Sequence, residues 1–177
     1  MIIGFIGDMG SGKTLSMVRL AYSLHNKGYK IYSNFSLKFP FEYFTLPDIM
    51  NFAEGDVNFT NTVFLIDEAH IFIDARRSAS AKNLALSYFI LQTRKQNVWL
   101  FFTTQYYHQV DKRLRASTNA FVESNFKSYT NSLGHQDNKC LNTWNIVKSN
   151  KIITKKFIFN ANPFFNLYDT NELIRPI

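Results

Sequence analysis

The chain has 177 residues, of which 46% are hydrophobic and 19% charged, a composition that is typical of one globular domain and excludes a disordered chain. The single cysteine, Cys140, excludes an internal disulfide, and no apolar run reaches the length of a membrane span. We therefore expect a soluble, cytoplasmic protein whose 18 Phe, 9 Tyr and 2 Trp residues mainly fill its core.

The net charge of +7 is concentrated in one segment of the chain. Residues 76–115 contain eight basic residues and one acidic residue, Asp111, whereas basic and acidic residues balance over the rest of the chain. A local excess of one charge indicates where a partner of the opposite charge binds. The segment 76–115 is therefore the expected contact region for an anionic partner.

Hydrophobic periodicity and turn residues predict alternating strands and helices along the first two thirds of the chain. In chain order they are a strand at 1–7, a helix at 13–27, a strand at 29–35, a short helix at 47–53, a strand at 62–66, a helix at 83–93, a strand at 98–104 and a short basic helix at 109–115. In the helix at 83–93, Leu84, Tyr88 and Leu91 fall on one face. The alternation predicts an α/β fold with a mainly parallel sheet.

The pattern changes after about residue 120. Short β-prone runs at 120–128, 143–148 and 152–159 are separated by Asn, Ser, Gly and Asp residues. We expect an antiparallel β extension of the same sheet. The prediction is one domain over 1–177, with a core of about 1–120 and a β-rich extension of about 120–165.

A phosphate-binding motif lies between the first strand and the first helix. Residues 7–14 read GDMGSGKT, which matches the P-loop pattern G-x-x-x-x-G-K-[ST] in its strand–helix context. Its backbone N–H groups and the helix N-terminus bind phosphate oxygens, and the lysine supplies a full positive charge. The expected nucleotide-binding residues are Gly7, Asp8, Met9, Gly10, Ser11, Gly12, Lys13, Thr14 and Leu15.

The strand "VFLID" delivers a carboxylate to the same edge of the sheet. Asp67 at its end, together with the Thr14 hydroxyl, is expected to hold Mg²⁺, which prefers oxygen ligands. Glu68 follows directly, and we expect it to act as the general base that activates a water for hydrolysis. The letters DEAH at 67–70 do not make a helicase box, because such a helicase needs two domains of this kind and the chain supplies one.

Another apolar strand, "VWLFFTT", ends beside Gln105. In P-loop ATPases with an additional strand, a polar residue here contacts the γ-phosphate and the lytic water, and we assign that role to Gln105. A GTPase is disfavoured because the chain has no N-K-x-D string. A small-molecule or nucleotide kinase is the main rival, but it has no use for a water activated by Glu68.

The order of these motifs resembles the FtsK–HerA superfamily of P-loop ATPases, and more closely its Zot-like branch, which includes filamentous-phage assembly proteins and viral packaging proteins. The runs "IDEAHIFIDARRS", "SYFILQTRKQNV", "TTQ", "QVDKRLR" and "YDT" carry the resemblance, which spans nearly the whole chain. It implies a RecA-like fold, ATP and Mg²⁺ as cofactors, a homo-oligomeric ring such as a hexamer or pentamer, and double- or single-stranded DNA as partner.

The resemblance also implies an arginine that reaches the nucleotide of a neighbouring subunit and stabilises charge on the transferred phosphoryl group. Arg94 is the first candidate, and Arg113 or Arg115 is the second. For DNA we favour the loop 74–82, where basic and hydroxyl side chains suit phosphate contacts without base reading. Its basic residues are Arg76, Arg77 and Lys82. A stacking surface of aromatic residues is the alternative.

One departure from the family bears on the biological role. Filamentous-phage members usually continue into a membrane helix and an outer domain, whereas this sequence stops at Ile177. We therefore expect a packaging-type motor in the host cytoplasm, in contact with a virion or capsid protein. A membrane-associated assembly ATPase, with its anchor elsewhere, stays open. His70 and His108 are expected to pack or hydrogen-bond, since no Cys/His spacing indicates a zinc site.

Overall fold

The computed structural model describes residues 1–54, 59–72, 81–93, 97–130, 132, 134, 136–149 and 151–169. Its elements, with η for a 3-10 helix, are β1 (Ile2–Ile6), α1 (Lys13–His25), β2 (Lys30–Ser33), β3 (Glu42–Tyr43), α2 (Leu46–Glu54), β4 (Thr62–Ile66), α3 (Ala69–Phe72), α4 (Ala81–Thr93), β5 (Trp99–Thr104), η2 (Tyr107–Gln109), α5 (Lys112–Ser117), β6 (Ala120–Thr130), β7 (Gln136–Lys148), β8 (Lys151–Asn160) and η3 (Asn162–Leu167).

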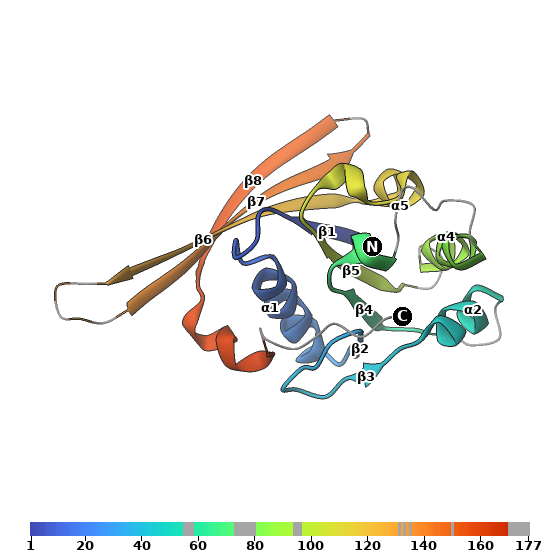
Figure 1. The fold of residues 1–177 in the computed structure, drawn as a ribbon, viewed down its shortest axis with the longest axis horizontal. Helices are drawn as coiled ribbons and strands as arrows, with labels where there is room; N and C mark the ends of the chain where they lie inside the picture. Colours follow the sequence, from blue (N-terminus) through green and yellow to red (C-terminus); the bar gives the residue numbers. More distant parts are fainter. Residues whose placement is uncertain are drawn as a thin grey trace.

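The strands of the described residues form one sheet in the order β3-β2-β4-β5-β1-β6-β7-β8 (Figure 1). The strands from β3 to β6 run parallel, and β7 and β8 are added antiparallel. The predicted RecA-like α/β fold, with a mainly parallel sheet and an antiparallel extension, is confirmed. β1 is central, with β5 and β4 on one side and β6 on the other, and this order positions the site described below.

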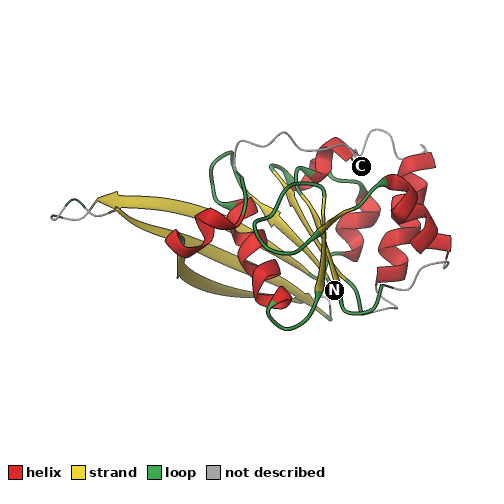
Figure 2. Cartoon of the chain, turned by 90° about the horizontal axis from the view of Figure 1, so that it is seen from below, coloured by secondary structure: helices red, strands yellow, loops and turns green. Residues whose placement is uncertain are grey.

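Helices cover both faces of the parallel part of the sheet, as Figure 2 shows. α1 packs on the face that carries Ile3 and Phe5, while α2, α4 and α5 pack on the face that carries Ile2 and Phe64. Because successive strand residues point to opposite faces, strands buried on both sides need apolar residues at nearly every position. All five residues of β4 are buried for this reason.

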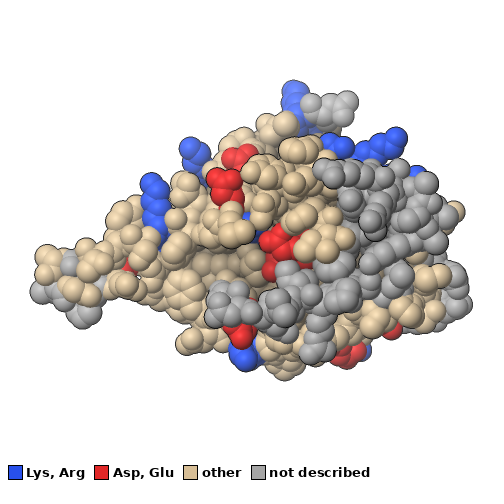
Figure 3. Space-filling model, in the orientation of Figure 1, with Lys and Arg blue, Asp and Glu red and all other residues tan. Residues whose placement is uncertain are grey.

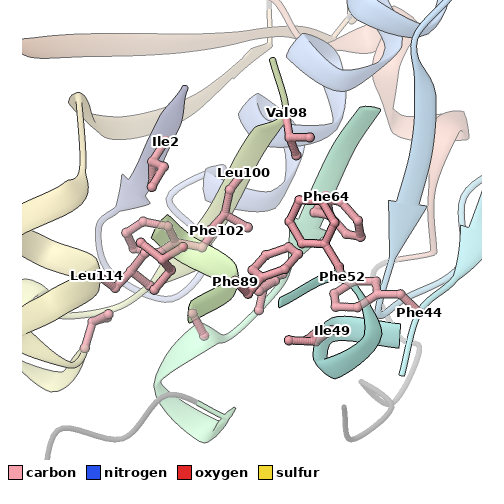
Figure 4. Packing of buried hydrophobic residues seen from close by; sticks show 14 residues of the cluster. Ile2, Phe44, Ile49, Phe52, Phe64, Phe89, Val98, Leu100, Phe102 and Leu114 are labelled. Carbon is pink, nitrogen blue, oxygen red and sulfur yellow. The ribbon is translucent and has the colours of Figure 1, made fainter. Parts of the chain in front are cut away.

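Phenylalanine fills the core, as the composition predicted. On the α2/α4 face, Phe64 packs edge-on against Phe89 and Phe44, with ring centroids 4.9 Å and 5.4 Å away, and Phe52 joins the same cluster (Figure 4). Edge-to-face pairs at such distances add stabilisation beyond the area they bury. Among the side chains that the structure describes, six Phe residues are less than 2% exposed, namely Phe5, Phe52, Phe64, Phe89, Phe101 and Phe102.

The helix predicted at 83–93 differs from α4 in its start and in its buried face. α4 begins at Ala81, so Lys82 belongs to this helix. The sequence analysis had placed Lys82 in the preceding loop, and that prediction was wrong. The face with Tyr88 and Leu91 is turned outward, each side chain being 53% exposed, while Phe89 and Ile90 are buried. Periodicity could not separate the two faces, because apolar residues occur on both.

The short helix predicted at 109–115 is shifted toward the carboxyl end. α5 starts at Lys112 because the Asp111 carboxylate caps it, accepting the backbone N–H of Arg113 at 2.8 Å. Residues Tyr107–Gln109 form a separate 3-10 turn.

The β extension grows directly out of the core sheet through β6. Its first residues, 120–123, pair with β1, while the whole strand pairs with β7. The predicted boundary near residue 120 therefore falls at the start of a strand that belongs to both parts. The turn η3, which the sequence analysis did not anticipate, brings the chain back from β8 onto α1 and β7. No helix within the described residues is long and apolar enough to cross a membrane.

Phe64→Ala should lower the free energy of unfolding by about 3–5 kcal/mol, because it leaves a cavity among packed rings. Phe157→Ala is the matched control, since Phe157 on β8 is 53% exposed and its removal should cost under about 1 kcal/mol. Urea denaturation followed by circular dichroism measures both. Equal losses in the two variants would contradict the aromatic core.

Candidate functional site

The P-loop at residues 7–14 connects β1 to α1 in a turn that needs glycine at two positions. Gly7 and Gly12 have φ angles of +144° and +87°, which residues with a side chain rarely adopt. A Cβ atom on Gly7 would lie 2.7 Å from Ser11 Oγ, and one on Gly12 would lie 3.1 Å from Cys140 Sγ. The loop therefore packs tightly against itself and against β7.

The first turn of α1 presents positive charge to the loop. No side chain caps this end of the helix, and its first turn carries no acidic residue. Its backbone N–H groups thus suit an anion. Lys13 is only 6% exposed, and its Nζ donates to the Asp8 carbonyl oxygen at 3.0 Å. The ammonium group is held across the loop by this contact.

One carboxylate joins three elements of the fold. Asp67 directly follows β4 and is 8% exposed. Its Oδ1 accepts hydrogen bonds from Thr14 Oγ1 at 3.0 Å and from Thr103 Oγ1 at 2.6 Å. Because Thr14 lies in α1 and Thr103 in β5, the Asp67 side chain connects the end of β4 to the P-loop helix and to β5.

The surroundings of Asp67 suit a cation. Burial raises the pKa of its carboxyl above the ordinary value, and the nearby Glu68 charge raises it further, whereas the Thr103 and Thr14 hydroxyls and the Lys13 ammonium lower it. Two adjacent carboxylates in a partly buried site are costly without a balancing positive charge. Carboxylate and hydroxyl oxygens are ligands that Mg²⁺ prefers, so Asp67 and Thr14 fit the predicted ion.

The backbone of Asp67 is held by a residue that the sequence analysis missed. Asn34, just after β2, is 1% exposed; its Oδ1 accepts the Asp67 N–H at 2.8 Å, and its Nδ2 donates to the Asp67 carbonyl oxygen at 3.1 Å. This paired contact satisfies both backbone groups of Asp67. Asn34 therefore acts through Asp67 as a positioning residue.

Glu68 has an unusual backbone conformation. Its φ of +52° lies in the left-handed region, which non-glycine residues seldom adopt outside turns and functional sites. Its N–H donates to Thr103 Oγ1 at 2.8 Å, and this bond helps to hold the turn. Its Oε2 lies 3.2 Å from His70 Nδ1, although neither atom has hydrogen-bond geometry to a partner within the described residues. The structure therefore places the Glu68 carboxylate on the wall of the cleft, beside the His70 ring.

These groups line one cleft of about 380 Å³, within the size range of small-molecule sites. The P-loop, Asp67 and Glu68 form part of its wall, and four aromatic residues form much of the rest, namely Phe35, Phe126, Phe165 and Tyr168. Burial raises the pKa of Tyr168 to about 12, and the Asp67 carboxylate adds to the rise. Figure 3 shows that this face of the molecule is hollowed beside the P-loop, with acidic side chains near the hollow.

The structure brings together only some of the predicted site residues. Met9, Gly10, Gly12, Lys13, Thr14, Leu15, Asp67 and Glu68 line the cleft. Gln105 lies in the bend after β5 and is not among its described lining residues, whereas Thr103, two residues earlier, contacts Asp67. β5 thus brings the buried hydroxyl of Thr103, and not the residue beyond its end, to the carboxylate.

The predicted basic residues lie away from these contacts or outside the described part of the chain. Arg113 is exposed in the first turn of α5. Arg115 is partly buried, with its guanidinium 5.2 Å from the Tyr107 ring centroid. Arg76, Arg77 and Arg94 lie outside the described residues, and of Lys82 only the backbone is described. The residues expected to contact DNA therefore stay a prediction.

Sequence reasoning missed seven of the described contributors to the site, namely Asn34, Thr103, Phe35, Phe126, Phe165, Tyr168 and Asp169. Asn34 and Thr103 follow or end strands next to β4 or β1, and that position was the signal that could have found them. Phe126 and Phe165 carry no motif, and only the path of the extension brings them to the P-loop. Tyr168 and Asp169 lie in the run "YDT", which supported the family resemblance but was not assigned to the site.

No protein-family model and no curated protein matches this chain in sequence. Among solved structures, the N-terminal domain of zonular occludens toxin from Neisseria meningitidis matches with a TM-score of 0.65 and 18% identity, covering 95% of this chain and 98% of that one. The genome packaging NTPase B204 from Sulfolobus turreted icosahedral virus 2, in complex with ATP-gammaS, matches with a TM-score of 0.57 and 14% identity, covering 86% and 95%.

The flagellar accessory protein FlaH from Methanocaldococcus jannaschii also matches, with a TM-score of 0.51 and 13% identity over 87% of this chain and 88% of that one. At such identities the similarity establishes the fold. The predicted resemblance to Zot-like P-loop proteins is confirmed at that level: this chain has the fold that the zonular occludens toxin domain and B204 share.

Proposed function

We propose that this chain is a Mg²⁺-dependent ATPase that works as a homo-oligomeric ring and translocates DNA in the host cytoplasm, in viral genome packaging or virion assembly. The observation that carries the proposal is the convergence of the P-loop, Thr14, Asp67 and Glu68 on one cleft. The fold shared with B204, a genome packaging NTPase solved with ATP-gammaS, supports it.

Nucleotide binding falls to the loop and to the start of α1. The loop N–H groups and the free first turn of the helix would receive the phosphates. Lys13 would exchange the Asp8 carbonyl oxygen for phosphate oxygens, moving only its side chain. Thr14 and Asp67 would hold Mg²⁺, which when bound neutralises charge on the β- and γ-phosphates.

Hydrolysis falls to Glu68. Its carboxylate lines the cleft beside Asp67, where it would take a proton from the attacking water. The Thr103 hydroxyl, which donates to Asp67 and accepts from the Glu68 N–H, would keep the two carboxylates in fixed relation. Gln105 at the end of β5 would reach the γ-phosphate only in the nucleotide-bound state.

An arginine from a neighbouring subunit would complete the site. Arg94 and Arg113 are the candidates, and the exposure of Arg113 suits a contact in trans. Arg115 is less suited, since its guanidinium already lies over Tyr107. DNA would bind through Arg76, Arg77 and Lys82 at phosphate groups.

Lys13→Ala and Glu68→Gln should both abolish ATP turnover, for different reasons. Lys13→Ala removes the charge that binds the phosphates. Glu68→Gln removes the general base, and the Glu68→Gln protein should still bind ATP. Phosphate release and equilibrium binding of a fluorescent ATP analogue distinguish the two effects. Substantial hydrolysis by the Glu68→Gln protein would contradict the role of Glu68, and transfer of labelled phosphate to a metabolite would favour a kinase.

Asn34→Ala should lower ATPase activity by about 10- to 100-fold, because loss of a group that orients a metal ligand commonly has that effect. The activity should recover partly at high Mg²⁺ concentration, which a purely structural defect would not allow. Asn97→Ala is the matched control, since Asn97 is exposed and its side-chain amide donates to Asn61 at 3.1 Å, outside the cleft. A Mg²⁺ titration of activity unchanged by Asn34→Ala would refute the positioning role.

DNA should stimulate the ATPase, and the stimulation should fall steeply as salt rises, because phosphate contacts release counterions. A combined Arg76→Ala, Arg77→Ala variant should reduce the stimulation while leaving the rate without DNA unchanged. Sedimentation in parallel measures the oligomeric state. A wild-type protein that binds no DNA at low salt would count against a translocase but not against an ATPase.

A further inference from the structure

The cleft over the P-loop has two chemically different ends. Asp67 and Glu68, which follow β4, lie at one end, and Phe126 of β6 and Phe165 of η3 lie at the other. β4 and β6 are on opposite sides of β1 in the sheet, and the P-loop follows β1, so the loop lies between the two ends. The cleft thus runs from carboxylates, across the phosphate-binding loop, to a pair of rings.

This order fixes the direction in which a nucleotide triphosphate would lie. The terminal phosphates, with their cation, belong at the carboxylate end, because Asp67 and Glu68 there, with the neighbouring Thr14 hydroxyl, offer oxygen ligands for a metal ion. The base lies at the opposite end of a nucleotide, several bonds beyond the phosphates. It would therefore meet Phe126 and Phe165.

The aromatic end is held rigidly by contacts outside the cleft. The Phe126 and Phe165 rings pack edge to face with centroids 5.9 Å apart. η3 is tied at its start, where Asn138 Nδ2 donates to Asn162 Oδ1 at 2.7 Å, and at its end, where Lys38 N–H donates to the Leu167 carbonyl oxygen at 2.7 Å. A wall anchored at both ends is a preorganised surface.

Further packing fixes η3 against the P-loop helix. The guanidinium of Arg19 in α1 lies 4.5 Å from the Phe159 ring centroid and 5.7 Å from that of Phe164. Phe165 itself is 37% exposed, so its ring is open to a ligand while its neighbours anchor the turn.

The aromatic end offers stacking and few groups that read a base edge. Met9 of the P-loop and Leu15 of α1 also line the cleft, and neither side chain has a strong hydrogen-bonding group. Tyr168 packs against Phe35, beyond β2, and so belongs to the carboxylate end. A base that contacts only ring faces is recognised by its flat aromatic surface and not by its hydrogen-bonding groups. Adenine and guanine share such a surface.

We propose that Phe126 and Phe165 form the base-binding subsite of the cleft and that this subsite accepts purine bases by stacking, with little discrimination between ATP and GTP. The inference deepens the proposed ATPase function and rests on it for the placement of the phosphates. It assigns a role to η3 and β6 that no part of the P-loop motif specifies.

The test compares three ligands that share a triphosphate, namely ATP, GTP and inorganic tripolyphosphate, by isothermal titration calorimetry with Mg²⁺. Phe165→Ala should weaken ATP and GTP binding alike, by about 5- to 100-fold, the range expected for loss of one stacked ring. Tripolyphosphate binding should not change, because it has no base. Phe165→Tyr should restore both nucleotide affinities, and Phe157→Ala on β8 should affect none of the three ligands.

Each other outcome decides against the proposal in a different way. Unchanged ATP affinity in Phe165→Ala would overturn the subsite, and a wild-type preference of more than about 100-fold for one purine would overturn the stacking mode, since that ratio requires hydrogen-bond reading. Equal weakening of tripolyphosphate and nucleotide binding in Phe165→Ala would also overturn the subsite, because Phe165 would then act on the phosphate end or on the fold and not on the base. If the wild-type protein binds none of the three ligands, the proposed ATPase function fails first.

Discussion

The buried carboxylate of Asp67 is the interaction on which the site depends. The carboxylate accepts the hydroxyls of Thr14 and Thr103, and the Asp67 backbone is held by Asn34, so four separate segments meet at one residue. A carboxylate in such a place is stable when hydrogen bonds and a cation compensate for lost water. The packing of β2, β4, β5 and α1 therefore serves to hold a charge where a cation and a phosphate chain can use it.

The parallel sheet makes this convergence possible. Parallel strands end at the same edge, so the residues that follow β1, β2, β4 and β5 come together although they are far apart in sequence. The aromatic core supports the edge from below, with Phe64 in the middle of β4 packed against rings from the neighbouring helices. Glu68, with its left-handed backbone, is supported by the same strands through Thr103.

Much of this could be predicted from sequence because the P-loop and the strand before Asp67 carry strong local patterns. In GDMGSGKT the glycines and the lysine together indicate a phosphate-binding loop, and in VFLID the apolar run indicates a buried strand that ends at a carboxylate. The buried face of α4 could not be predicted, since the exposed face carries the Tyr88 ring and Leu91, which are largely apolar like the buried Phe89 and Ile90. Asn34 and Thr103 were missed because their importance lies in the partner across the sheet, and Phe126 and Phe165 because the return of η3 onto α1 is a tertiary event.

The central position of β1 has a consequence for how the chain is made. β1 is synthesised well before its two partners in the sheet, β5 and β6, which start only at Trp99 and Ala120. At synthesis rates of about 5–20 residues per second, an unpaired and strongly apolar strand waits on the order of ten seconds for its neighbours. The aromatic end of the cleft is completed later still, when Phe165 is synthesised. A growing chain thus has its phosphate-binding residues early and the whole cleft only after Phe165 has been made. During that interval the unpaired β1 segment is open to capture by a chaperone or by another chain.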